Sequence, residues 1–94
     1  MKRSYEVQDK YHWNQERWQW ERVDRVQEYR GVEIATISTH DDYHKSYHRA
    51  YKVRYPSGLE TYWQINKRGS NIKKLKGWID FKISRDDPDM FSPV

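Results

Sequence analysis

Three histidines recur every four residues in the middle of the chain, at His40, His44 and His48, with two aspartates close behind the first. Imidazole nitrogen and carboxylate oxygen are ligands of zinc and other divalent ions. The three imidazoles would share one side only on a helical turn. The surrounding residues, Thr39 to Ser46, are polar and typical of a loop or a wide hairpin end. A polar loop is the favoured interpretation and a metal site is the alternative, so we expect no cofactor.

A second group of residues is able to bind anions. Between Tyr43 and Ile79 the chain carries nine basic side chains against one acidic side chain, Glu60, so this stretch has a charge of +8 while the whole chain carries +4. A segregated positive field predicts an anionic partner, either nucleic acid or an acidic protein surface. The candidate nucleic-acid-binding residues are Arg49, Lys52, Arg54, Tyr62, Gln64, Lys67, Arg68, Lys73 and Lys74.

Few residues in the sequence are spaced in a way that would support catalysis. Asp41, Asp42 and Glu60 offer carboxylates, but no nucleophile, base or glycine-rich phosphate loop is spaced to work with them. The chain has no cysteine, which excludes a disulfide framework, a thiolate metal site and a cysteine nucleophile. We therefore predict a protein that is not an enzyme.

Length and composition limit the architecture that positions these residues. Ninety-four residues make one domain with a thin core, and eight tyrosines and five tryptophans supply most of its bulk. The N-terminus lacks the apolar stretch of a signal peptide, and no apolar run is long enough to span a membrane. Together with the absence of cysteine, this predicts a cytoplasmic protein that does not enter a membrane. Its oligomeric state is left open.

Alternating apolar and polar residues predict two β-hairpins. The first turns at Arg30-Gly31 and the second at Pro56-Ser57-Gly58, where glycine supplies positive φ and proline fixes the bend. The predicted antiparallel sheet has about four strands, at residues 22–29, 32–38, 49–55 and 59–65.

One helix is predicted after the sheet, over residues 71–84. Ile72, Leu75, Ile79 and Ile83 recur at steps of three and four, which gives the helix an apolar stripe that packs on one face of the sheet. The fold class is therefore α+β, with a single domain over residues 22–84. Residues 85–94 form an acidic and flexible tail.

The aromatic-rich N-terminal segment, residues 1–21, allows two interpretations. Its tyrosines and tryptophans are paired at a spacing of two, which favours short extended pieces. Residues 14–26 are equally compatible with a helix, because Trp20 and Val23 would lie near one face.

Residues 50–83 resemble small sheet-plus-helix domains of phage and mobile-element proteins, such as the arm-site DNA-binding domains of tyrosine integrases and the plant AP2 domains. The matching features are the alternating strand from Tyr51 to Tyr55, Ser57-Gly58, Arg68-Gly69, the Lys73-Lys74 pair and Trp78. The chain departs from the family pattern in having Ser70 after Arg68-Gly69 and a helix rich in lysine. The resemblance implies DNA binding by the sheet.

Alternation places Lys52, Arg54, Tyr62 and Gln64 together on an open face of the sheet, where they could contact phosphates and bases. The competing interpretation is an ordinary solvated face. The lysines of the helix would lie on the opposite side of the domain. The leading functional hypothesis is nucleic-acid binding, and the alternative is a phage-type accessory or inhibitor protein that binds another protein.

Overall fold

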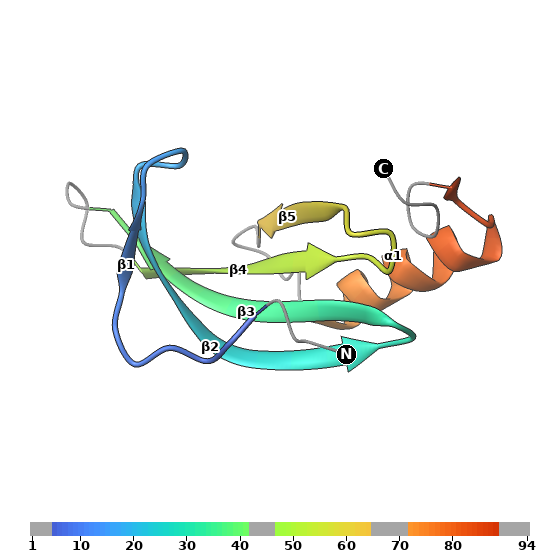
Figure 1. The fold of residues 1–94 in the computed structure, drawn as a ribbon, viewed down its shortest axis with the longest axis horizontal. Helices are drawn as coiled ribbons and strands as arrows, with labels where there is room; N and C mark the ends of the chain where they lie inside the picture. The colour runs from blue at the N-terminus through green and yellow to red at the C-terminus, as the bar shows by residue number, and fades with distance from the viewer. Residues whose placement is uncertain (1–4, 42–46, 65–71, 89–94) are drawn as a thin grey trace.

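A computed structural model of the protein describes residues 5–41, 47–64 and 72–88. In this part of the chain five strands form one antiparallel sheet in sequence order, and one helix follows them. Figure 1 shows that the sheet is strongly curled. The elements are β1 (His12–Asn14), β2 (Gln19–Tyr29), β3 (Val32–His40), β4 (Tyr47–Arg54), β5 (Glu60–Gln64) and α1 (Ile72–Ser84).

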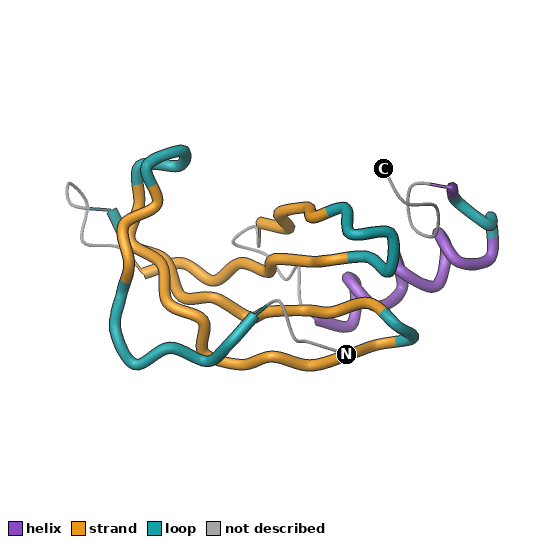
Figure 2. Tube along the Cα trace, viewed as in Figure 1, coloured by secondary structure: helices purple, strands orange, loops and turns teal. Residues whose placement is uncertain are grey.

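The α+β class, the antiparallel sheet and the C-terminal helix are confirmed. The sheet has five strands, one more than predicted, because β1 lies within the segment before residue 22 and pairs with an extended β2. A helix over residues 14–26 is wrong, since β2 covers most of that range (Figure 2). The prediction of a loop from Thr39 is also wrong at its start. Thr39 and His40 still belong to β3 and pair across to β4.

Turn chemistry explains both predicted hairpins. Arg30 and Gly31 have φ values of 52° and 84°, the double positive φ of the two-residue turn that matches the natural twist of paired strands. In the second hairpin Gly58 has a φ of 95°, and its amide donates to the Tyr55 carbonyl at 2.8 Å. The Tyr55 amide then donates to Leu59, which closes a three-residue loop.

The helix packs on one face of the sheet through its apolar stripe. Leu75 and Ile79 are almost fully buried and form one core cluster with Val32, Ile34 and Val53. At the turn end of this face, Asp80 of α1 accepts hydrogen bonds from the Tyr29 hydroxyl at 2.8 Å and from Arg30 at 2.9 Å. The helix is therefore fixed to the β2–β3 turn by polar contacts as well as by its apolar side.

The opposite face of the sheet has a second, smaller core. Ala35, Ile37 and Ala50 point away from the helix and pack with Val23 and with Tyr5, which comes from the segment before β1. Figure 1 shows this segment crossing the sheet on the side away from α1. Both faces of the one sheet are thus covered, each by a different end of the chain.

A β-bulge in β2 separates the part of the sheet next to the helix from the β1–β2 hairpin. The register between β2 and β3 shifts between Val23 and Arg25, which leaves Asp24 as the extra residue. The carboxylate of Asp24 accepts hydrogen bonds from Ser38 and from Arg22. A bulge bends and twists its strand, and this accounts for the way the hairpin turns up at one end of the sheet (Figure 1).

Two glycine substitutions should change stability in opposite directions. Gly77 lies inside α1 with no atom within 4 Å of an added Cβ, so Gly77→Ala should raise the free energy of unfolding by about 0.5–1 kcal/mol. Gly31→Ala should lower it by about 1–2 kcal/mol, because a Cβ is strained at a φ of 84°. Urea denaturation of both variants measures the two effects. Equal signs would contradict the assigned backbone.

Candidate functional site

The predicted nucleic-acid-binding residues do not converge on one surface. Lys52, Arg54 and Tyr62 share the face of the sheet that Tyr5 covers, whereas Arg49 pairs with Ser38 on the face that carries the helix. Lys73 and Lys74 are exposed on α1. The side chain of Gln64 and the residues Lys67 and Arg68 lie outside the described part of the chain. Tyr5 therefore covers the centre of the sheet face that was expected to be open.

Lys52 is held in an ion pair with Glu21 of β2. Its Nζ lies 2.9 Å from Oε1 of Glu21, whose side chain is 8% exposed, and Gln19 donates to the other carboxylate oxygen at 2.7 Å. Desolvation raises the pKa of Glu21, but hydrogen bonds from Gln19 and Lys52 outweigh it and leave the pKa below its ordinary value. Glu21 is thus ionised at neutral pH and neutralises Lys52.

Arg54 is engaged in the same way by Glu60. Its guanidinium lies 2.8 Å from Oε2 of Glu60, and the Tyr5 hydroxyl donates to that same oxygen at 2.7 Å. The Tyr5 amide donates to Glu33 at 2.8 Å, so two carboxylates hold this residue on the sheet. Burial, followed by the contact with Glu60, raises the pKa of Tyr5 well above its ordinary value. The tyrosine therefore stays protonated and bridged.

Tyr62 is also occupied. The guanidinium of Arg17 lies 3.4 Å from the centre of its ring, and Gln19 donates to its hydroxyl at 2.9 Å. A base could not stack on that ring face without displacing Arg17. Beside these residues runs a groove of about 720 Å³ whose lining includes Glu6, Glu16 and Glu21, and whose charge does not favour phosphate.

The histidines are divided between the two faces of the sheet. His40 is paired across the strands with Tyr47, and His48 is paired with Thr39. These two cross-strand pairs are neighbours along the sheet, so the imidazoles of His40 and His48 point to opposite faces. His44 lies outside the described residues. Within the described residues there is no group of three or more potential ligands able to hold a metal ion.

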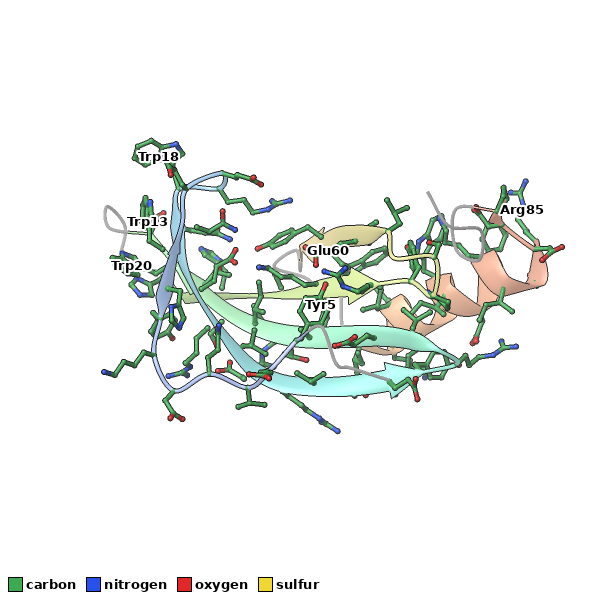
Figure 3. The ribbon with its side chains drawn as sticks, in the orientation of Figure 1. Tyr5, Trp13, Trp18, Trp20, Glu60 and Arg85 are labelled. Carbon is green, nitrogen blue, oxygen red and sulfur yellow. The ribbon has the colours of Figure 1, made fainter. Side chains whose placement is uncertain are left out.

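A cluster of aromatic side chains forms at the β1–β2 hairpin. Trp13 lies edge-on to Trp18 and to Trp20, with ring centroids 5.7 Å and 5.3 Å apart, and Trp20 stacks on His40 at 6.3 Å. Tyr11 meets His40 edge-on at 4.7 Å. We name these five residues the tryptophan surface. Figure 3 shows the three tryptophans together at one end of the molecule.

The most exposed member of this surface is Trp18, at the tip of the hairpin. Its side chain is 70% exposed, and its backbone has a φ of 53°, the left-handed conformation that disfavours large side chains. The loop before it is closed by Asn14, whose carboxamide oxygen accepts from the amides of Glu16 and Arg17. The aromatic spacing in the sequence indicated extended strands, but no residue pattern indicated a positive φ at a tryptophan.

Comparison of the chain with protein-family models, curated proteins and solved structures finds no match. The resemblance of residues 50–83 to integrase arm-site and AP2 domains accordingly stays a prediction. None of the described helices is long and apolar enough to cross a membrane.

The Glu21–Lys52 pair should make stability depend on pH in one direction. Because the folded pKa of Glu21 is lowered, its contribution is complete above the ordinary value of 4.5 and is lost as pH falls through the folded pKa. Glu21→Gln should therefore cost about 1–3 kcal/mol of unfolding free energy at pH 7 and much less at pH 3. Urea titrations at both pH values measure the difference.

The matched control is Glu16→Gln, which removes an exposed carboxylate from the hairpin loop and should leave stability unchanged at both pH values. A stability gap between wild type and Glu21→Gln that stays the same from pH 7 to pH 3 would contradict the assignment of this ion pair.

Proposed function

We propose that this chain is a non-enzymatic binding protein that docks another protein through the tryptophan surface. Exposed tryptophan and tyrosine side chains are the residues that most often carry binding energy in protein interfaces, because each buries a large area at a small entropic cost. Trp13 and Trp18 are 37% and 70% exposed and lie next to each other. An apolar area of this kind on a small, highly charged domain supports a docking role.

The observation that carries the proposal is the conformation of Trp18. A left-handed φ costs a non-glycine residue about 1–2 kcal/mol, and glycine or asparagine would remove most of that cost. The edge-on contact with Trp13 offsets part of this cost, so the stability of the hairpin gives little net reason for a tryptophan at its tip. The ring makes one edge-on contact, with Trp13, and otherwise faces outward. The backbone is thus strained at a residue whose side chain is mostly exposed, and backbone strain of this kind is found at functional sites. This favours a role for Trp18 in binding.

Charge favours a protein partner over nucleic acid at this surface. Between residues 5 and 24 the chain carries five acidic and three basic side chains. Two of the basic ones, Arg17 and Arg22, already lie over the rings of Tyr62 and Tyr11. A phosphate backbone gains little from such a surface. The tryptophan surface is better complemented by a protein partner that presents apolar side chains within a neutral or basic area.

The engagement of the carboxylates supports a role without catalysis. Glu21 and Glu60 lie on the covered face, and both are neutralised by cations and hydrogen bonds. The absence of cysteine supports an intracellular setting, which we include in the proposal. An accessory or inhibitor role toward a host protein agrees with these features.

Trp18→Asn should separate binding from folding. The substitution removes the exposed ring and its edge contact but relieves the left-handed strain, so the free energy of unfolding should stay within about 1 kcal/mol of wild type. Affinity for a partner recovered with the wild-type protein should fall about 30-fold, the loss typical of an interface hot spot. Affinity purification followed by titration with the purified partner measures both quantities.

Lys10→Gln is the matched control, because it changes an exposed side chain of the segment before β1 and lies outside the tryptophan surface. It should bind the partner as the wild type does. Recovery of the same partner with equal affinity by Trp18→Asn would refute the proposal.

A further inference from the structure

The outer side of α1 exposes two aromatic rings away from the core. Leu75 and Ile79 face the sheet, whereas Trp78 and Phe81 lie along the flank of this buried stripe and are 41% and 47% exposed. An amphipathic helix ordinarily places its aromatic residues on the buried stripe. Here Lys74, Trp78, Phe81 and Arg85 follow one another at helical spacing and form an exposed row.

The two rings form an ordered platform. Trp78 and Phe81 stack with centroids 5.6 Å apart and an interplanar angle of 23°. Trp63 of β5 lies 6.4 Å from Trp78 and supports it from the sheet. The ammonium of Lys82 lies 5.6 Å from the Trp78 ring and 3.4 Å from a carboxylate oxygen of Asp87.

Arg85 completes the platform at the C-terminal end of the helix. Its guanidinium lies 5.3 Å from the centre of the Phe81 ring. A recess of about 280 Å³ lies beside it, lined by Trp78, Phe81, Lys82, Arg85, Asp87 and Pro88. A flat π-system with a cation at its edge suits a planar ring that is attached to an anionic group.

Charge along the rest of the outer side is positive. Lys73 and Lys74 are exposed in the first turn, and Gly77 leaves the helix surface bare between them and Phe81. The one carboxylate of α1, Asp80, is neutralised by Arg30 at 2.9 Å. Asp86 and Asp87 directly follow Arg85, and Asp87 lies 3.4 Å from Lys82, so the net positive charge of this side is concentrated at Lys73 and Lys74.

We propose that this outer side of α1 binds single-stranded nucleic acid. Lys73 and Lys74 contact phosphates at one end of the strand, Arg85 contacts a phosphate about 16 Å further along the helix, and unpaired bases stack between them on the platform of Trp78 and Phe81. Base–aromatic stacking is tolerant of sequence, since every base has a π-face. A duplex keeps its bases stacked within itself and would use the lysines alone, so the exposed rings favour a single strand.

This site is independent of the tryptophan surface. Figure 3 shows Trp18 and Arg85 at opposite ends of the molecule, whose longest extent is 41 Å. The proposed nucleic-acid site therefore includes Lys73 and Lys74, which the sequence had already suggested. It adds Trp78, Phe81 and Arg85. It does not require Lys52 or Arg54, which are paired on the other face of the sheet.

Fluorescence anisotropy with a labelled thymidine oligomer tests the proposal. Three phosphate contacts at about −0.7 each give a slope of log affinity against log salt of about −2, so affinity should fall about 15-fold between 50 and 200 mM salt. Trp78→Leu and Phe81→Leu should each weaken binding about tenfold, because leucine keeps the apolar contact but removes stacking. The double variant Lys73→Gln, Lys74→Gln should flatten the salt slope.

Trp18→Asn and Lys10→Gln are the controls, and both should bind the oligomer as the wild type does. Their behaviour keeps a failure of this site distinct from a failure of the protein-docking proposal. A duplex of the same length and polyglutamate should bind at least tenfold more weakly than the oligomer. The proposal is overturned by no binding at 50 mM salt, by equal binding of polyglutamate or duplex, or by unchanged binding of the leucine and glutamine variants.

Discussion

A single curled sheet has to be covered on both faces by a chain of 94 residues, and the rest of the structure depends on how this is done. The C-terminal helix covers one face with Leu75 and Ile79. Only one buried aromatic, Tyr5, comes from the N-terminal segment to close the described part of the other face, over small residues such as Ala35 and Ala50. Small side chains on the sheet leave room for a tyrosine, and two carboxylates, Glu33 and Glu60, fix it there.

This way of covering the sheet also decides where charge is available. Cations on a covered face must be paired, because burial without a partner is costly. Lys52 meets Glu21 from β2 and Arg54 meets Glu60 from β5. The excess of basic residues between 43 and 79 is therefore partly cancelled by an acid outside that stretch. What remains on the surface is a positive helix at one end of the sheet and, at the other, a hairpin that exposes tryptophan side chains.

The sequence predicts those parts of the fold that local chemistry determines. The hairpins follow from alternation and from the turns at Gly31 and Gly58, and the helix follows from its apolar spacing. For β1 the sequence left short extended pieces and a helix equally open, because three residues are too short to show a period. The covered face escaped because the contacts of Tyr5 and Glu21 join distant segments, which no local pattern encodes. Lys73 and Lys74 were found as candidates, whereas Trp18 was missed because nothing in a tryptophan indicates left-handed backbone.

The separation of the two proposed sites has a mechanical consequence. Between them lies a sheet whose two cores are both well buried, so the distance from the tryptophan surface to the platform on α1 is set by packed strands and not by a linker. A rigid spacer holds two ligands at a constant separation and orientation, which raises the effective concentration of one at the other. If both proposed sites are occupied, the domain places a protein beside a single strand without any change in its own shape. Together the two proposals describe an adaptor, a role that rests on binding alone.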